Sequence, residues 1–413
     1  MPGGKDMNQQ IQKKILKIVI VILLSTIFLN GCVGQKELNN LGIVNLMGID
    51  LINNGKYKIS LHIIKPSTGQ GGQPASAPGP GSAIWIGEAK GNTIQEAVRN
   101  IRKKTSWILT WSHCDIIIVG KDLCKRGLGP VVDYLARDME IRLTSNLLTT
   151  TGKAWHILRH SSEEKKEPVS DQIDGLINNI QDWSMAYNLN LKETLARLVS
   201  KKQELVIGKL NLTAAGPVKK GQELLSQKSS QEALKLVLEM KGATIFQKDK
   251  WIGVLNETET RGFMRLLNQI KIHTMNIKLD NSNSLISLDT YKTNTIIKWR
   301  EQKALDQFII KIQESCKITE QNSGLDLTNP ELIEKIENNK EKAVKNETRR
   351  VLSKIQQLNT DILGLKDIMD KQNSDLFKKI NNKNESIITN LKFNIIVNSI
   401  ITQPGKIRKS ILK

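Results

Sequence analysis

Aromatic residues are scarce in this chain: Phe, Trp and Tyr make up only 4% of its 413 residues. Proteins that bind nucleic acid usually combine clustered Arg and Lys with aromatic side chains that stack on bases. Cations are in excess here, with 61 Lys and Arg against 41 Asp and Glu, but 48 of them are Lys and they are scattered along the chain. We therefore expect no nucleic acid among its partners.

Cysteine is also rare, with four residues at positions 32, 114, 124 and 316. If the first of them is modified, an odd number remains, which cannot form a complete disulfide framework, and no Cys-x-x-Cys spacing suggests zinc. Cys114 adjoins the apolar run 116–119, so we expect it to be a small core residue. The sequence predicts no structural disulfide.

Signatures of catalysis are missing as well. His156 and His160 are four residues apart, a spacing that can bind metal on a helix, but the Glu of a zinc protease motif is absent and Arg159 would repel a cation. There is no Gly-rich phosphate loop with Lys-Ser or Lys-Thr and no Gly-x-Ser-x-Gly elbow. We therefore expect no catalytic residue, no metal and no cofactor, in a protein that is not an enzyme.

Only one long apolar run occurs, Ile18–Leu29, which follows Lys13, Lys14 and Lys17. Its twelve residues would span about 18 Å as a helix, well short of the ~30 Å hydrocarbon core of a membrane. A positively charged segment followed by a short apolar run is typical of a secretory signal. The sequence thus predicts a signal peptide over residues 1–31, and a permanent transmembrane helix is the weaker interpretation.

The signal ends in Leu29-Asn30-Gly31-Cys32, which resembles the bacterial lipobox, in which the Cys is acylated. Asn30 departs from the small residue that is usual there, and a plain signal peptide with an incidental Cys is the alternative. Several acyl chains, such as palmitate, anchor a protein durably to a membrane, whereas one chain binds marginally. We expect lipidation at Cys32 and a lipoprotein on the outer face of the cytoplasmic membrane.

Alternating strand and helix signals follow the signal peptide. Two strands, 43–49 and 57–64, flank Asn53-Asn54-Gly55, a strong turn signal. A Gly/Pro-rich loop at 66–82 separates them from further strand-like sequence. This alternation favours an α/β domain with a mixed sheet over residues 32–205.

Within that domain four more elements are expected. Thr93 starts a Thr-Ile-Gln-Glu capping box, which predicts a helix. Apolar runs predict a strand at 115–119, a helix at 131–142 and a strand at 147–150.

The second half of the chain divides into two further predicted domains. Residues 206–275 contain a hairpin of 242–246 with 251–255, then a helix that Asn256 could cap. Residues 276–413 contain a long helix near 330–358, which starts at Asn329-Pro330, and a late strand at 391–401.

Two clusters of charged residues are candidate contact sites for a partner protein. Asp138 and Arg142 are four residues apart on the expected helix and can form a surface ion pair, so a purely structural role is the simpler interpretation. Gly262, beside the second cluster, indicates close helix packing or a kink. The candidate residues are Arg137, Asp138, Glu140, Arg142, Glu259 and Arg261.

Five blocks of sequence occur in the order typical of one family. They are Gly48-Ile49-Asp50, the run 113–120 (HCDIIIVG), the run 242–246 (GATIF), Glu259-Thr260-Arg261-Gly262, and the run 361–365 (DILGL). Together with the lipobox they resemble the Ger(x)C family, the lipoprotein C subunits of bacterial spore germinant receptors. The resemblance covers most of the chain after the signal peptide.

The resemblance implies a fold and a function. It implies an elongated body of three mixed-sheet α/β domains, which acts in spore germination as a non-catalytic scaffold of a germinant receptor. It also implies that the partners are the membrane-embedded A and B subunits of that receptor, with the acylated Cys32 in the lipid of the spore inner membrane. A solute-binding lipoprotein of a membrane transporter is the alternative function.

Overall fold

The structure of this chain is a computed structural model. It describes residues 14–19, 40–65, 84–160, 168–200, 202–214, 236–279, 284–300, 307–322, 324–375, 377–378 and 387–403. Most of the predicted signal peptide, the lipidation site Cys32 and the loop 66–82 lie outside these residues. Among the described residues, no helix combines the length and the apolarity that crossing a membrane requires.

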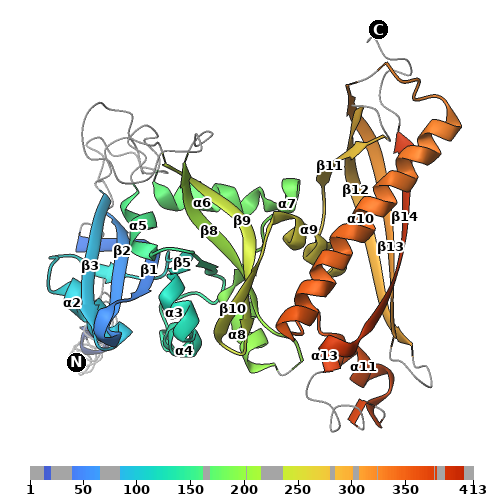
Figure 1. The fold of residues 1–413 in the computed structure, drawn as a ribbon. Helices are drawn as coiled ribbons and strands as arrows, with labels where there is room; N and C mark the ends of the chain where they lie inside the picture. Colours follow the sequence, from blue (N-terminus) through green and yellow to red (C-terminus); the bar gives the residue numbers. More distant parts are fainter. Residues whose placement is uncertain are drawn as a thin grey trace, which may run out of the picture.

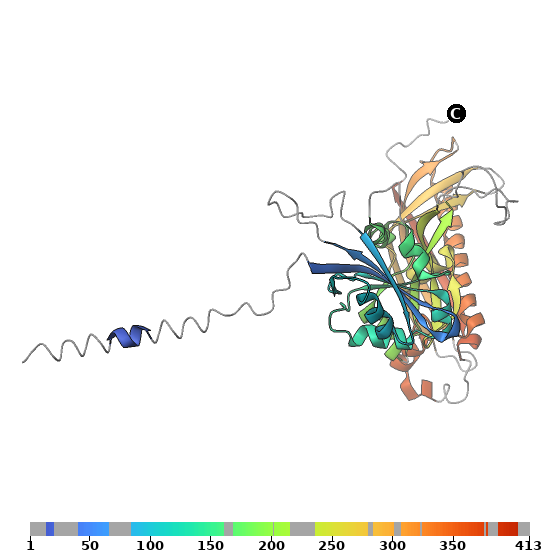
Figure 2. The ribbon, with the colours of Figure 1, turned by 90° about the vertical axis from the view of Figure 1, so that its left-hand side faces the viewer.

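The described chain forms an elongated body built on two mixed sheets (Figure 1). In Figure 2 the N-terminal, ten-stranded sheet lies in front of the four-stranded sheet. Buried apolar residues from both sheets and their helices form one core cluster. The mixed α/β class expected from the sequence is therefore confirmed.

The N-terminal sheet begins with an antiparallel pair, as the turn signal predicts. β1 (Leu41–Leu51) pairs with β2 (Tyr57–Ile64), and β3 (Ile84–Gly91) continues the sheet. Between β1 and β2, Asn54 and Gly55 have φ of 69° and 73°, a left-handed conformation that Asn and Gly tolerate best. The composition of the turn thus sets the register of the first pair.

The helix α2 (Ile94–Arg102) packs on this end of the sheet. The backbone N–H of Glu96 donates to Thr93 Oγ1 at 3.1 Å, and Glu96 Oε2 accepts from Asn92 N at 2.8 Å. The cap predicted at Thr93 is confirmed, although the returning bond reaches the residue before it. The buried face consists of Ile94, Ala97, Val98 and Ile101.

Parallel strands form the middle of the sheet. β1 pairs with β5 (Ile116–Val119), which pairs with β6 (Asn146–Thr149), while β4 (Ile108–Thr110) pairs with the start of β1. Three helices connect or cover these strands: α3 (Lys121–Arg126), α4 (Gly129–Arg137) and α5 (Ala154–Arg159).

The expected helix 131–142 is wrong in its second part, because α4 ends at Arg137. Asp138 is extended and its Oδ1 accepts a hydrogen bond from the Glu140 N–H at 3.0 Å. Such a local side-chain bond competes with the helical one and favours a turn. Asp138 and Arg142 therefore do not share a helix face, and Arg137 pairs with Asp133 instead, at 2.8 Å.

The sheet continues beyond the predicted boundary at residue 205. Through Thr149 and Lys209, β6 pairs with β8 (Val206–Ala214), which leads to β9 (Leu236–Gln247) and the edge strand β10 (Lys250–Leu255). The elements before β8 are α6 (Val169–Asn178), α7 (Ile180–Trp183), β7 (Leu189–Asn190) and α8 (Leu191–Val199).

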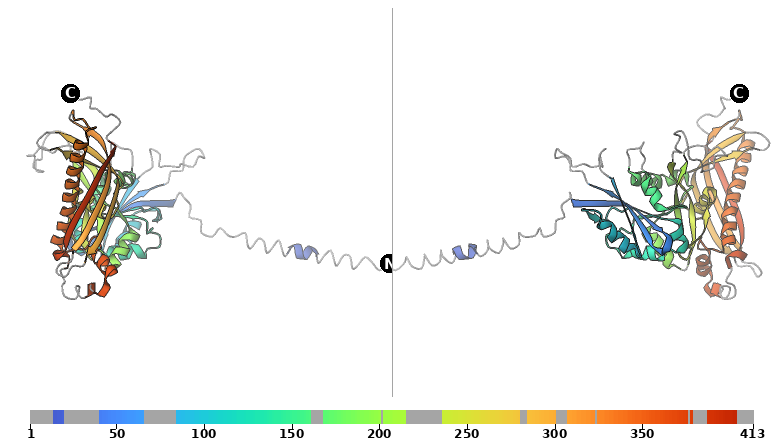
Figure 3. Two further views of the ribbon diagram at one scale, coloured as in Figure 1. Left: turned by 90° about the vertical axis from the view of Figure 1, so that its right-hand side faces the viewer. Right: turned by 60° about the vertical axis from the view of Figure 1, so that its left-hand side comes forward.

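The second sheet has the order β11-β12-β13-β14 and forms the opposite end of the body (Figures 1 and 3). Its strands are β11 (His273–Lys278), β12 (Leu285–Arg300), β13 (Gln307–Gln321) and β14 (Lys392–Gln403). The predicted boundary at residue 275 falls inside β11. α9 (Glu257–Leu266) follows β10 and contacts both sheets. The helices at this end are α10 (Pro330–Leu358), α11 (Leu365–Gln372) and α13 (Ile387–Asn390).

The long helix predicted from Asn329-Pro330 is α10, and it connects the parallel strands β13 and β14. Asn329 Oδ1 accepts from the Glu331 N–H at 2.9 Å. Cys114, Cys124 and Cys316 are buried free thiols, so the core role expected for Cys114 is confirmed.

Asp50, in the first of the five blocks, ties β1 to α5. It is fully buried, and its two carboxylate oxygens accept from the Ala154 and Trp155 N–H groups at 2.8 and 3.0 Å. Burial raises the pKa of Asp50 despite these bonds. A Cβ at Gly120 would lie 2.0 Å from Asp50 Oδ1, so the carboxylate fits only because residue 120 is Gly.

We expect Asp50→Ala to lower the free energy of unfolding by about 1–3 kcal/mol, because two buried N–H groups lose their acceptor. Urea unfolding followed by Trp fluorescence measures this. Asp122→Ala is the matched control: Asp122 is exposed and pairs with Lys153, so its loss should cost about 0.5 kcal/mol or less. Equal losses in the two variants would contradict the structural role of Asp50.

Candidate functional site

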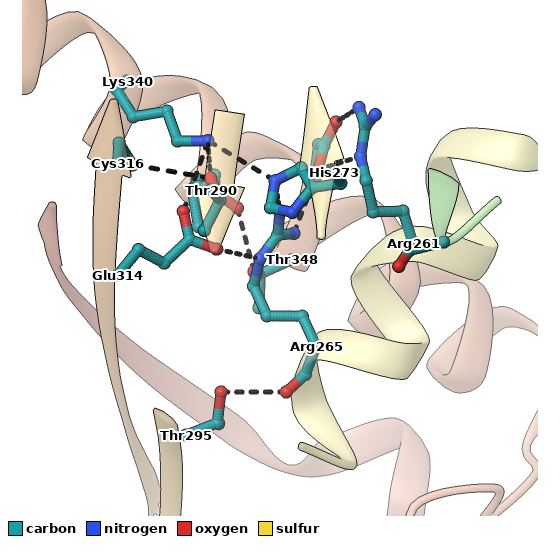
Figure 4. A network of polar contacts seen from close by, with 12 residues as sticks. Arg261, Arg265, His273, Thr290, Thr295, Glu314, Cys316, Lys340 and Thr348 are labelled. Carbon is teal, nitrogen blue, oxygen red and sulfur yellow. Dashed lines mark hydrogen bonds and ion pairs between the residues drawn. The ribbon is translucent and has the colours of Figure 1, made fainter. Parts of the chain in front are cut away.

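A cluster of ionisable side chains is buried where α9 and α10 meet the second sheet (Figure 4). α9 contributes two arginines, α10 a lysine and a glutamate, β13 a glutamate and β11 a histidine. None of them is more than 7% exposed. We call this group the charge cluster, and its members are Arg261, Arg265, His273, Glu314, Lys340 and Glu347.

Arg265 is the centre of the charge cluster. Its Nε donates to Glu314 Oε1 at 2.8 Å and its Nη1 donates to Glu347 Oε2 at 3.0 Å. The other oxygen of Glu347 accepts from Arg261 Nη2. One carboxylate thus bridges two guanidinium groups from the same face of α9, which lie four residues apart.

Lys340 completes the cluster from the α10 side. Its Nζ lies 3.3 Å from Glu314 Oε2 and donates to Thr290 Oγ1 at 2.9 Å. Three cations therefore face two carboxylates. The carboxylates are thus outnumbered. Because an unpaired charge in the interior costs several kcal/mol, the loss of a carboxylate should destabilise the cluster more than the loss of a cation.

The imidazole of His273 is held neutral. Its Nε2 lies 3.2 Å from Arg265 Nη2 and 3.4 Å from Lys340 Nζ. Arg and Lys can only donate, so Nε2 must accept and the ring proton sits on Nδ1. Burial, together with the positive charges of Lys340 and Arg265, lowers the pKa of His273 well below its usual value.

The two central groups stay charged. Burial opposes ionisation of Glu314, but the charges of Arg265 and Lys340 outweigh it and lower its pKa to about 2. Burial likewise opposes the charge on Arg265, and Glu314 and Glu347 outweigh it, so the pKa of Arg265 is raised. The cluster is thus a buried network of ion pairs in which each cation lies beside a carboxylate and the cations exceed the carboxylates by one.

Gly262 allows α9 and α10 to approach closely at the cluster. A Cβ on Gly262 would lie 2.7 Å from Val351 Cγ2 and 3.2 Å from the Glu347 carbonyl oxygen. The sequence leaves two roles open for Gly262, close helix packing or a kink, and the structure shows close packing. The approach brings Arg261 and Arg265, on either side of Gly262, within reach of Glu347.

Of this cluster, the sequence predicts a functional role only for Arg261, as a residue that contacts a partner protein. The structure places Arg261 inside the molecule, because its guanidinium is bound by Glu347. A signal for the missed residues exists in the apolar patterns. Glu314 is a charged residue at one of the alternating buried positions of β13. Lys340 and Glu347 are charged residues within the otherwise apolar buried stripe of α10.

The other candidate contact residues lie at the surface in separate places. Arg137 is exposed and pairs within α4, while Glu140 Oε2 accepts from the Trp111 N–H at 3.3 Å. Arg142 is exposed. Asn256 caps α9, as the sequence predicts, and Glu259 forms a capping box with it. The structure does not bring the two clusters together.

Metal ligands do not converge in the part of the chain that the structure describes. Across the described ranges, no group of three or more His, Cys, Asp or Glu side chains could hold a metal ion. His156 lies on α5, and His160 is the residue at which that helix ends. The chemistry available to the charge cluster is therefore ion pairing.

We expect the two sides of the cluster to respond unequally to substitution. Glu314→Gln leaves three cations with one carboxylate and should cost about 3–5 kcal/mol of unfolding free energy. Lys340→Met leaves two cations with two carboxylates and should cost about 1 kcal/mol. Urea unfolding of both variants tests this, and equal costs would show that charge balance does not govern the cluster.

Stability should also depend on the protonation of His273. Below pH 6.5 the unfolded chain binds a proton that the folded chain excludes, so the free energy of unfolding decreases as the pH falls. His273→Asn removes this contribution. Its loss of stability between pH 7.5 and 5 should be smaller than that of the wild type by about 2 kcal/mol.

The control for this measurement is His156→Asn, since His156 is exposed on α5. It should keep the wild-type dependence on pH. His62, whose pKa burial lowers to about 4, contributes in the same direction and remains in both variants. An unchanged pH dependence in His273→Asn would contradict the neutral, enclosed imidazole.

Comparison with known proteins identifies the family. Residues 34–212 match the "Spore germination protein N-terminal domain" family and residues 241–405 match "Spore germination B3/GerAC like, C-terminal". Spore germination protein KC of Bacillus subtilis (strain 168) is 24% identical over 88% of this chain and 89% of its own length. Spore germination protein GerQC of Bacillus cereus is 22% identical over 94% and 99%.

A solved structure shares the fold. The crystal structure of the GerBC protein superposes with a TM-score of 0.54 at 18% identity, covering 86% of this chain and 96% of that one. The family resemblance carried by the five sequence blocks is therefore confirmed. The chain belongs to the Ger(x)C family and is a spore germination protein of the GerC type.

Proposed function

We propose that this protein is the lipid-anchored C subunit of a spore nutrient germinant receptor and acts there as a non-catalytic scaffold. The observation that carries the proposal is that both family domains lie in one chain, in order, behind a segment that ends in the lipobox Leu29-Asn30-Gly31-Cys32. The anchor would place the body on the outer face of the spore inner membrane. The partners are the membrane-embedded A and B subunits of the receptor.

The use of charge inside the body supports a scaffold role. The buried charged groups at the α9–α10 contact form ion pairs with one another, and Asp50 caps a helix. Groups held this way stabilise one arrangement of the elements. A body of this kind offers a rigid outer surface to its partners.

Anchoring adds affinity without adding contacts. A specific protein interface buries about 800 Å² on each partner, a small share of the surface of a chain of 413 residues. Lipid attachment at Cys32 confines the body near membrane-embedded partners and so raises their effective concentration. Moderate contact surfaces are then sufficient for a stable complex.

Deletion of the gene tests the proposed function. Spores without this protein should fail to germinate with the nutrients that its receptor serves, while germination through other receptors in the same spores continues. A Cys32→Ala variant should lose metabolic lipid labelling and most of this activity, because the tether is gone. The matched control is Cys114→Ala, which removes a buried thiol and should keep the labelling.

Two results would contradict the proposal. Unchanged germination of the deletion strain through the cognate receptor would refute the scaffold role. Normal lipid labelling of Cys32→Ala would refute the anchor.

A further inference from the structure

An open hollow of about 480 Å³ lies beside the C-terminal half of α10, where Glu259 of α9 forms part of its wall. Three cations line it: Arg349, Arg350 and Lys354. The remaining lining side chains are the uncharged polar groups of Asn346, Ser353 and Gln357. Every residue that lines the hollow is thus polar or charged, and three cations against one carboxylate give it a net positive charge.

The cationic side chains of the hollow make few hydrogen bonds and ion pairs within the chain. Arg349 Nη1 lies 3.4 Å from Asn346 Oδ1, and Lys354 Nζ lies 3.9 Å from Glu259 Oε1. The guanidinium of Arg350 makes no hydrogen bond or ion pair with the residues described. Glu259 is itself occupied, because its Oε2 accepts from the Asn256 N–H. Two guanidinium groups are therefore free to bind an anion.

Helix stability does not explain these cations. Lys345 and Arg349, and likewise Arg350 and Lys354, are like charges four residues apart, and such pairs repel on a helix. Cations at the C-terminus of a helix can complement its dipole, but the effect is confined to the last turn. The last turn of α10 contains no basic residue.

The two halves of α10 also differ in charge. In the first half, Glu337 and Glu341 accept hydrogen bonds from the Ile401 and Ser399 N–H groups at the edge of β14. In the second half the carboxylate of Glu347 points inward to the charge cluster. No carboxylate of that half is left to balance the cations on its outer face.

We propose that this hollow binds an acidic segment of a partner protein. Adjacent arginines suit carboxylates, because each guanidinium can donate two parallel hydrogen bonds to one carboxylate. The amide and hydroxyl groups between them can pair with peptide groups. The volume lies within the usual range for binding sites, roughly 300–1,000 Å³. The lining contains no aromatic side chain on which a nucleobase could stack and no aliphatic side chain against which an acyl chain could pack.

This inference rests on the proposed function for the identity of the partner, a membrane-embedded subunit of the receptor. The binding chemistry rests on the hollow alone. The two can therefore be tested separately, first with a peptide and then in the complex.

The first test measures binding of a fluorescent twelve-residue peptide of alternating Glu and Gly to the full chain in detergent. Arg349→Gln/Arg350→Gln should weaken binding at least tenfold, and higher salt should weaken the wild type. The matched control is Lys342→Gln/Lys345→Gln, which removes two charges from α10 outside the hollow and should change binding less than twofold.

Three results of this test would overturn the proposal. Equal weakening in both double variants would mean that only the overall charge matters. Unchanged binding in Arg349→Gln/Arg350→Gln would mean that the peptide binds elsewhere. Binding of phosphatidylglycerol vesicles that depends on Arg349 and Arg350, without peptide binding, would assign the hollow to a lipid headgroup.

The second test places a benzophenone at Ser353→Cys in the solubilised complex, since Cys114, Cys124 and Cys316 are buried. Illumination should cross-link the protein to a membrane-embedded subunit, and Arg349→Gln/Arg350→Gln should abolish the product. If those subunits co-purify without a cross-link, the hollow is not their docking site, although the proposed function stands. If they do not co-purify, the proposed function fails and the peptide measurement alone decides on the hollow.

Discussion

The ion pairs of Arg265 hold the two ends of the molecule in one orientation. α9 follows directly from β10 of the first sheet, whereas Glu314 and Glu347 belong to the strand and helix at the other end. A guanidinium with no contact to water is tolerated only if its donors meet charged acceptors in good geometry. A small rotation of one end against the other would break these bonds in a desolvated site, so the pairing selects one arrangement.

A second contact, far from the charge cluster in sequence, resists the same rotation. The segment after α8 meets the block 361–365: the Glu204 N–H donates to the Asp361 carbonyl at 2.9 Å, and Lys202 pairs with Asp367 at 2.7 Å. Asp361 in turn caps α11 through the Leu365 and Lys366 N–H groups. Two separate contacts thus oppose a hinge motion that a single contact would permit.

Local chemistry explains which features could be predicted from the sequence. The caps at Thr93, Asn256 and Asn329 and the turn at Asn54 depend on residues within four positions, so their signals are complete in the sequence. The pairing of β6 with β8 depends on residues 60 positions apart, and no local pattern marks it. The charge cluster could not be predicted for another reason. The apolar patterns of β13 and α10 mark single charged positions, but the members lie on four elements that only the fold brings together.

The orientation of α10 links stability to the proposed recognition. On one helix, Glu347 points inward to Arg261 and Arg265 while Arg349 and Arg350 point to the hollow. Arg349 and Arg350 follow Glu347 by two and three residues on the same helix. The ion pairs of Glu347 fix the rotation of α10 about its axis, and so they also fix the positions of the two arginines. The carboxylate that could have neutralised them is used in the interior. The cationic surface of α10 is therefore a direct consequence of the way the core is held together, and it is as rigid as the core.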